Sequence, residues 1–396
     1  MNKRFFFRPT FDEEPVKNSP PVRSYQECSR CVMDTTDPHI TFDNAGHCCH
    51  CTEYLETRAK HSYQGQESDA ALDQILENIS RDGRGKKYDC VIGVSGGADS
   101  SYLAYLITQR GLRPLAVHMD NGWNSEKAVI NIKVITRKMG IDYESYVLDW
   151  EAFKNLQLSF LKASVPEAET PTDVAIPAAL HSVAAKYGVK YILSGGNLAT
   201  EGILPKSWHY DIRDLKYINY IHSTFGTRPL KSFPTFGYKK EIFYKLVKGM
   251  RMIYPLNSVP FNKEQAIQLL SEKFDWRPYG GKHHESTYTK FIQSYYLYEK
   301  FKIDYRRATL STRICVGEIK RCKALEQLRS KPYNPEEVDE MKNYVAKKLG
   351  IDRDELERIM RLPPKWYWDY PNDEQRLTYI YNTYRRVFNK EKLDRF

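Results

Sequence analysis

Marks of membrane, secreted and disulfide-bonded proteins are missing from this sequence. No run of about 18 apolar residues occurs in its 396 residues, so no membrane insertion is expected. The apolar run at residues 5–7 follows basic residues but is far too short for a secretory signal peptide. We therefore expect a cytoplasmic protein. There thiols stay reduced, so its 8 cysteines favour metal ligands or free thiols over disulfides.

The main glycine-rich stretch also lacks two common nucleotide-binding patterns. It has neither the Gly-Lys-Ser/Thr ending of a Walker A loop nor the Gly-x-Gly-x-x-Gly spacing of a dinucleotide turn. Instead, Ser95-Gly96-Gly97-Ala98-Asp99-Ser100 joins an apolar run at 90–94 to a helix-like segment. The glycines allow close backbone approach, and the following helix directs N–H groups and its positive dipole end toward one spot. This geometry suits a phosphate group.

The motif resembles the PP-loop of the ATP pyrophosphatase group, whose members split ATP between its alpha and beta phosphates. Asp99 has two open roles, because it can cap the helix or help to hold Mg²⁺. We predict that the following residues bind ATP here: Val94, Ser95, Gly96, Gly97, Asp99, Ser100 and Ser101.

Repeated strand–helix units surround this loop. Strands are predicted at 90–94, 115–119, 143–148 and 191–193, with helices at 100–110, 125–139, 151–162 and 174–187. This alternation predicts an α/β fold with a doubly wound parallel sheet, of the PP-loop or adenine nucleotide alpha hydrolase-like kind. The predicted ATP-binding domain covers residues 69–205.

Ligands of such sheets collect at the carboxyl ends of the strands. In PP-loop proteins the second strand end holds the nucleoside, so we place Val117, His118 and Met119 there. His118 fits a packed side chain as well as a ligand. The fourth strand end carries a second glycine-rich loop, in which Gly195 and Gly196 are predicted to contact ATP. Polar side chains of the same loop, Asn197 and Glu201, are predicted to bind substrate.

The cysteine pattern predicts a zinc site before the sheet. Two pairs with C-x-x-C spacing, Cys28 with Cys31 and Cys48 with Cys51, supply four thiolates for a tetrahedral structural site. Cys49 or His50 is an alternative ligand that fits less well, and four unrelated core cysteines are the other alternative. The zinc knuckle is assigned residues 28–68. Residues 1–27, rich in proline, are predicted to form an extended arm.

A mostly helical substrate or partner region is predicted over residues 206–396. Helices are expected at 239–250, 263–273 and 287–300, and charged amphipathic helices follow from residue 320. The densest polar chemistry is Lys282-His283-His284-Glu285, which can bind anions or move protons, with a solvated turn as the plainer alternative. Cationic side chains further on, predicted to bind an anionic substrate, are Arg306, Arg307 and Arg313. The net charge of +10 also favours a polyanionic partner.

These segments in this order resemble the N-acetyl sugar amidotransferase family, the WbpG- and PseA-like enzymes of bacterial surface-glycan synthesis. The resemblance covers residues 25–385 and implies ATP, Mg²⁺ and structural Zn²⁺. Such enzymes adenylate the acetamido oxygen of an N-acetylated nucleotide-sugar or nonulosonic acid, and ammonia then replaces AMP to give an acetamidino sugar. Lipopolysaccharide O-antigen or flagellar glycan is the expected pathway. The implied catalytic residues are Asp99, Lys282, His283, His284 and Glu285.

The source of ammonia is expected to be a partner. Residue 2 is Asn, so no N-terminal cysteine nucleophile is predicted, and no other cysteine lies in a nucleophile-elbow context. We therefore expect a separate glutaminase subunit, with a cyclase-like companion as an option. The alternative function is a tRNA-modifying PP-loop enzyme, a thiolase or lysidine synthetase. However, no RNA-binding module is recognisable, so nucleic acid is not the expected partner. A nucleotide-binding scaffold without catalysis is a third class.

Overall fold

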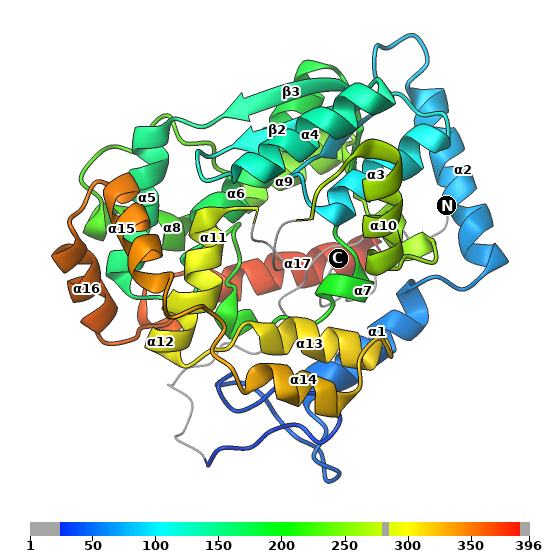
Figure 1. The fold of residues 1–396 in the computed structure, drawn as a ribbon. Helices are drawn as coiled ribbons and strands as arrows, with labels where there is room; N and C mark the ends of the chain where they lie inside the picture. Colours follow the sequence, from blue (N-terminus) through cyan, green and yellow to red (C-terminus); the bar gives the residue numbers. More distant parts are fainter. Residues whose placement is uncertain (1–23, 279–284, 389–396) are drawn as a thin grey trace.

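The centre of the protein is a five-stranded parallel sheet, shown in a computed structural model that describes residues 24–278 and 285–388 (Figure 1). The strands are β1 (Cys90–Gly93), β2 (Pro114–Asp120), β3 (Asp142–Val147), β4 (Tyr191–Leu193) and β5 (Arg251–Ile253). They lie in the order β3-β2-β1-β4-β5, and every neighbouring pair is parallel. The predicted doubly wound parallel sheet is thereby confirmed.

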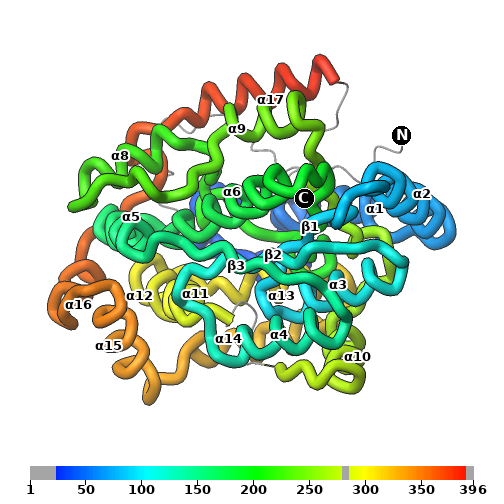
Figure 2. The backbone as a smooth tube through the Cα atoms, turned by 90° about the horizontal axis from the view of Figure 1, so that it is seen from above, coloured from blue at the N-terminus to red at the C-terminus, as the bar shows by residue number. Residues whose placement is uncertain are grey.

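Apolar runs form these strands because helices cover both faces of the sheet. Successive side chains of a strand point to opposite faces, so Ile92 and Val91 enter different cores. Ile92 packs with α2 (Gln66–Asp82), α3 (Ala98–Gln109), α4 (Glu126–Met139) and α10 (Lys263–Phe274). Val91 packs instead with α6 (Thr170–Lys186), which lies across the other face (Figure 2).

The strand order places the topological switch point between β1 and β4. From β1 the chain winds outward through β2 to β3, then returns to the other side of β1 as β4 and β5. The loops that leave β1 and β4 therefore start side by side at the carboxyl edge of the sheet. This is where ligands of such sheets bind.

Further helices surround this unit. The described chain also forms α1 (Cys49–His61), α5 (Trp150–Ala163), α7 (Leu198–Glu201), α8 (Leu215–Phe225), α9 (Tyr238–Ile242), α11 (Thr287–Phe291), α12 (Leu297–Phe301), α13 (Arg306–Cys315), α14 (Arg321–Leu328), α15 (Val338–Leu349), α16 (Arg353–Arg361) and α17 (Glu374–Phe388). Short 3-10 turns lie at Lys206–Trp208, Pro255–Ser258 and Tyr367–Asp369, and π-helical turns at Phe243–Val247 and Ile292–Tyr296. None of the helices in the described ranges combines the length and apolarity that crossing a membrane requires.

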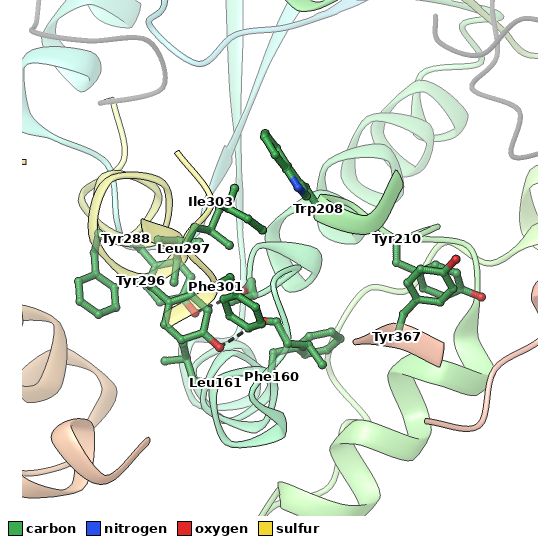
Figure 3. Close-up of a cluster of buried hydrophobic side chains, with 14 of the residues drawn as sticks. Phe160, Leu161, Trp208, Tyr210, Tyr288, Tyr296, Leu297, Phe301, Ile303 and Tyr367 are labelled. Carbon is green, nitrogen blue, oxygen red and sulfur yellow. Dashed lines mark hydrogen bonds between the residues drawn. The ribbon is translucent and has the colours of Figure 1, made fainter. Parts of the chain in front are cut away.

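Aromatic side chains of the C-terminal half build the largest core, together with α5 (Figure 3). The Tyr296 hydroxyl donates to the Val165 carbonyl oxygen at 3.0 Å inside this core. The rings of Tyr210 and Tyr367 stack with centroids 4.2 Å apart. These tyrosines are fully buried, so they serve packing, the use expected for helical faces rich in aromatics.

Three details differ from the sequence expectations. The segment predicted as one helix over 239–250 is α9 and a π-helical turn, ended by Gly249 at a φ of +64°, and β5 follows directly. Because β5 pairs with β4, the sheet continues past the predicted domain boundary at residue 205. α8 forms in a stretch where no helix was expected. Within the predicted arm, residues 1–23 lie outside the described residues.

Candidate active site and cysteine knuckle

The PP-loop (residues 95–101) connects β1 to the first turn of α3. Gly96 has a φ of +83°, and a Cβ atom there would lie 2.4 Å from the Ala128 carbonyl oxygen, so only glycine fits. Within the loop, the Ser95 hydroxyl oxygen accepts from the Gly97 N–H at 3.2 Å and lies 3.3 Å from that of Ser100. Ser101 is buried in the first turn of α3.

Two donors hold the PP-loop from outside. The indole N–H of Trp276 donates to the Gly96 carbonyl oxygen at 3.1 Å, and the Asn131 amide approaches the same oxygen at 3.4 Å. Asn131 also exchanges two 2.9 Å hydrogen bonds with the main chain of Arg277. Trp276 and Arg277, just after α10, are therefore fastened to the PP-loop by the Trp276 indole and by Asn131 of α4.

The second loop (residues 194–201) lies directly against the PP-loop. A Cβ atom on Gly195 would be 2.9 Å from the main-chain nitrogen of Ser100. The Gly196 N–H donates to the Ser194 hydroxyl oxygen at 3.2 Å. In the same loop, the Thr200 hydroxyl donates to Oδ2 of Asp99 at 3.3 Å. The two loops thus meet at the first turn of α3.

Asn197 has a structural role that sequence reasoning missed. It is fully buried, and its side-chain oxygen caps α7 by accepting from the Thr200 N–H at 3.0 Å. Its amide N–H donates to the Gly195 carbonyl oxygen at 3.1 Å. Both ends of the amide thus shape the loop, and the role of Asn197 in substrate binding stays a prediction.

Carboxyl groups gather beside the PP-loop. Asp99 lies 3.8 Å from the ammonium nitrogen of Lys263, which begins α10. Burial raises the pKa of Glu285, the negative charges of Asp99 and Glu201 raise it further, and Lys263 lowers it. The structure therefore brings together three predicted residues (Asp99, Glu201 and Glu285) with one cation. Glycine, not Asp99, occupies the N-cap of α3, so the capping role is not the one observed.

Glu285 is held in place through its main chain. Its carbonyl oxygen accepts from the Ser125 N–H at 2.7 Å, and the Thr287 N–H donates to the Trp123 carbonyl oxygen at 3.0 Å. These bonds fasten the start of α11 to the loop after β2. The neighbouring predicted catalytic residues Lys282, His283 and His284 lie outside the described residues.

Two further carboxyl groups were missed by sequence reasoning. Burial raises the pKa of Glu169 to about 8 and that of Asp173 to about 7; the charge of Asp173 also contributes to the shift of Glu169. Glu169 also interacts electrostatically with Glu285, and Asp173 lies 3.4 Å from Nδ1 of His209. The available signal was a run of acidic residues, at 167, 169 and 173, between two apolar helices.

The predicted nucleoside residues lie at the end of β2. The Val117 carbonyl oxygen accepts from the Val94 N–H at 2.9 Å, so these two join β2 to β1. His118 is buried, which lowers the pKa of its ring; Nδ1 lies 3.0 Å from the Val94 carbonyl oxygen and Nε2 lies 3.0 Å from the Asn124 amide nitrogen. Both ring nitrogens thus have partners within the protein, and the placement of His118 near the nucleoside stays a prediction. Met119 is partly buried beside the large core.

The predicted metal ligands come together in the cysteine knuckle (residues 28–51). The sulfur atoms of Cys28, Cys31, Cys48 and Cys51 all lie within 4.8 Å of one another, and all four residues are buried. Backbone N–H groups point at these sulfurs, as in Cys48 N–H to Cys28 Sγ at 3.2 Å, which favours thiolates. A buried four-thiolate set fits a tetrahedral metal ion.

The alternative ligands have other partners. Cys49 Sγ accepts from the Thr41 N–H at 3.5 Å, and Nε2 of His50 lies 2.6 Å from a carboxylate oxygen of Asp37. Neither belongs to the four-sulfur cluster.

The three predicted substrate arginines have different surroundings. Arg306 pairs with Asp304 at 2.6 Å, and Arg307 pairs with Glu27 and Asp34 at 2.9 Å each. Arg307 thereby fastens α13 to the cysteine knuckle. Arg313 is more open and pairs with Glu318 at 3.1 Å and Glu264 at 3.4 Å. Glu264 is next in sequence to Lys263, which pairs with Asp99. Arg313 is therefore linked to the site through its contact with Glu264.

A known family model matches the C-terminal part of the chain. Residues 285–387 match the family model of the LPS biosynthesis protein WbpG-like, C-terminal domain. The chain carries a WbpG-like C-terminal domain. The resemblance drawn from the sequence is confirmed by this match, which begins at Glu285 and so includes one carboxyl group of the site.

The chain is also similar to several other proteins. The chain is 22% identical over 320 residues to an uncharacterized protein of Methanocaldococcus jannaschii, MJ1599, covering 79% of this chain and 96% of that protein. It is 27% identical over 164 residues to the tRNA-specific 2-thiouridylase MnmA 2 of Fusobacterium nucleatum, covering 38% and 47%. The solved structure of NMN synthetase from Francisella tularensis aligns with 15% identity and a TM-score of 0.35, covering 75% of this chain and 97% of that chain. The WbpG-like domain and the PP-loop relatives support an ATP-using PP-loop enzyme.

Proposed function

We propose that this protein is an ATP-dependent amidotransferase that converts the acetamido group of an N-acetylated sugar into an acetamidino group. The substrate is a UDP-linked sugar or a nonulosonic acid used for bacterial surface polysaccharide (lipopolysaccharide O-antigen) or flagellar glycan. One observation carries the proposal: the WbpG-like domain begins at Glu285, and the carboxyl group of Glu285 interacts with Asp99 of the PP-loop. The family match and the ATP-loop chemistry thus meet in one site.

The reaction has two balanced steps. In the first, the acetamido oxygen attacks the alpha phosphorus of ATP, an oxygen–phosphorus bond forms, and pyrophosphate leaves. In the second, ammonia adds to the activated carbon, the carbon–oxygen bond breaks, and AMP leaves with the former acetamido oxygen. PP-loop N–H groups and hydroxyls of Ser95 and Ser100 would stabilise charge on the departing pyrophosphate.

Carboxyl groups supply the remaining chemistry. Oxygen ligands suit Mg²⁺, and the carboxyl groups of Asp99 and Glu201 would hold it, which leaves Glu285 available for proton transfer. When bound, Mg²⁺ would neutralise phosphate charge. Glu285 would take a proton from the incoming ammonium ion. The negative charge of Glu285 helps to raise the pKa of Glu169 to about 8. Glu169 can therefore gain or lose a proton near neutral pH.

Zn²⁺ is the proposed occupant of the cysteine knuckle, where four thiolates leave no open coordination position. Its role would be structural.

Ammonia is proposed to come from a separate glutaminase subunit, with a cyclase-like companion as an option. The described cysteines support this view: Cys90 is buried at the start of β1, and Cys315 lies beside Cys51 of the knuckle. Cys322 is exposed on α14. None of the three is on a nucleophile elbow in the described structure.

Isotope labelling tests the proposed reaction directly. The purified chain is incubated with ATP, Mg²⁺, ammonium and candidate N-acetylated UDP-sugars or nonulosonic acids carrying oxygen-18 in the acetamido group. The expected result is an amidine with one oxygen replaced by NH, together with labelled AMP. Label that stays in the sugar, or ADP in place of AMP, would contradict the proposal. Glutamine should replace ammonium poorly until the glutaminase partner is added.

A tRNA-modifying enzyme is the second candidate, favoured by the similarity to MnmA 2 over 164 residues and by the net charge of +10. Thiolation needs a reactive cysteine at the PP-loop. Cys90 starts β1, roughly 17 Å of extended chain before the loop. ATP–pyrophosphate exchange stimulated by bulk tRNA and not by N-acetylated sugars would favour this candidate.

A further inference from the structure

Tyr54 joins the cysteine knuckle to the second loop. It lies one turn after Cys51 on α1, and it is only 3% exposed. Its hydroxyl donates to the Leu198 carbonyl oxygen at 2.9 Å. Leu198 starts α7, a helix of four residues, and the carbonyl groups of the last four residues of a helix have no regular partner within it. The Tyr54 hydroxyl therefore satisfies a carbonyl group that α7 itself leaves open.

Gly202 makes room for this contact. A Cβ atom on Gly202 would lie 2.0 Å from Cε2 of Tyr54. The backbone of Gly202 has φ −70° and ψ −30°, which any residue adopts. Glycine is thus required at position 202 because a side chain would collide with the ring of Tyr54, and not because of the backbone conformation.

A second bridge runs through neighbouring residues of α13. The Val32 N–H of the knuckle donates to the Ser311 hydroxyl oxygen at 3.2 Å. The Ile203 N–H, just after α7, donates to the Thr312 hydroxyl oxygen at 3.0 Å. Both hydroxyl residues are fully buried, so water does not compete for these bonds.

The far end of α7 reaches the PP-loop. Thr200 donates to Asp99, and Gly195 packs against Ser100. A displacement of α7 would therefore move a hydrogen-bond partner of Asp99. Since α7 has a single turn, its position depends on these outside contacts more than on its own hydrogen bonds.

We propose that Tyr54 is a positioning residue through which the metal-loaded cysteine knuckle fixes α7 against the PP-loop. Metal occupancy of the knuckle and nucleotide binding at the PP-loop are coupled through the Tyr54 hydroxyl. This inference rests on the ATP-binding part of the proposed function and is independent of the sugar.

Hydrogen exchange of the full-length protein loaded with Zn²⁺ tests the coupling. In Tyr54→Phe, amides of Leu198, Thr200 and Ile203 should exchange faster by roughly two- to tenfold, the effect of one lost hydrogen bond. Chelation of the metal from the wild-type protein should speed exchange in the same segment. Chelation should add less in Tyr54→Phe, because the Tyr54 bridge is already broken and only the α13 bridge remains.

Tyr63→Phe is the matched control. Tyr63 also follows Cys51 closely in sequence, and its hydroxyl donates to a carboxylate oxygen of Asp69 at 2.9 Å, away from α7. This variant should leave exchange at residues 198–203 unchanged. Co²⁺ loading reports on the knuckle itself, so an unaltered thiolate–Co²⁺ absorption band in Tyr54→Phe shows that the four cysteines still hold metal.

Reciprocity supplies a second measurement. If the coupling exists, a non-hydrolysable ATP analogue must slow chelator-driven loss of Zn²⁺ by the same linkage. It should do so in the wild type and in Tyr63→Phe, and should do so less in Tyr54→Phe. Equal Zn²⁺ loss with and without a bound analogue, or equal exchange at residues 198–203 in both tyrosine variants, would overturn the role of Tyr54. Failure of the wild type to bind the analogue would instead overturn the ATP-binding part of the proposed function, while hydrogen exchange still decides the role of Tyr54.

Discussion

Gly195 and Ser100 touch across the switch point of the sheet. A Cβ atom on Gly195 would lie 2.9 Å from both the nitrogen and the Cα atom of Ser100. The main chains of the two loops are therefore packed at a separation that only glycine permits. This contact sets the distance between the PP-loop and the loop that carries Thr200 and Glu201.

The first prediction concerns this contact. Gly195→Ala should push the second loop away from α3 and weaken binding of a non-hydrolysable ATP analogue roughly tenfold or more, since overpacking costs about 1–3 kcal/mol. Gly188→Ala is the control, because Gly188 has a φ of +64° with no atom within 4 Å of an added Cβ. It should destabilise the fold through backbone strain and leave nucleotide affinity unchanged. Calorimetric titration of both variants decides, and equal affinities would contradict the prediction.

The second prediction concerns the acid limb of the pH–rate profile. Lys263 lowers the pKa of Glu285, so Lys263→Met should raise it. If Glu285 works as a base, the acid limb of kcat/KM should then move to higher pH. Lys263→Arg keeps the charge and should keep the limb in place. A limb that does not move in Lys263→Met would remove Glu285 from the role of base.

Sequence reasoning reached the parts of the site that depend on short motifs. The PP-loop and the four cysteine ligands have spacings with few structural solutions, and the structure assembles both as predicted. The strand β5 escaped because three residues, Arg251–Ile253, are too few to show periodicity. Whether a polar side chain serves ligand or fold was also beyond the sequence. Asn197 and Arg307 have suitable chemistry for substrate, and the structure shows that each also contacts tertiary neighbours, which their sequence positions do not reveal.

Two carboxyl groups at the start of α6 could likewise not be assigned a role from the sequence. Glu169 and Asp173 belong to no motif; burial raises the pKa of both, and nearby acidic groups raise that of Glu169 further. Burial is a property of the whole fold. Sequence analysis could detect the acidic residues at 167, 169 and 173, but it could not show that they point inward.

The third prediction uses Glu169 to change stability with pH. Its pKa of about 8 in the folded state lies above the value of about 4.3 in an unfolded chain. The folded protein therefore holds this proton more tightly, so the free energy of unfolding falls as pH rises from about 4 to about 8. Glu169→Gln removes this dependence. At pH 8 it should stabilise the protein by up to about 5 kcal/mol, since the shift is nearly four pKa units and one unit is about 1.4 kcal/mol, and by little at pH 4.

Urea unfolding of Glu169→Gln between pH 4 and pH 9 measures this effect. Glu340→Gln, an exposed carboxylate change on α15, is the control and should leave the slope of stability with pH as in the wild type. A parallel displacement of the whole curve in Glu169→Gln would mean that packing, and not the proton, accounts for the change.

The fourth prediction separates the metal ligands from their neighbour. Cys48→Ser removes one of four thiolates and should abolish tight metal binding, because a structural site needs its full ligand set. Cys49→Ser changes the adjacent thiol, whose sulfur accepts from Thr41, and should retain one metal ion per chain. Elemental analysis after dialysis against chelator measures both. Loss of metal from Cys49→Ser as well would reopen the assignment of ligands.

The fifth prediction distinguishes a fold arginine from a substrate arginine. Arg307 pairs with Asp34, which is 1% exposed, so Arg307→Met leaves a buried carboxylate without its cation. Removal of one partner of a buried pair costs about 3–5 kcal/mol, so the melting temperature should fall clearly. Arg313→Met removes a half-exposed pair with Glu318 and Glu264 and should lower stability by less than about 1 kcal/mol. If Arg313 binds the anionic sugar, its variant should instead raise KM for the sugar with KM for ATP unchanged. Equal melting temperatures for the two variants would contradict the structural role of Arg307.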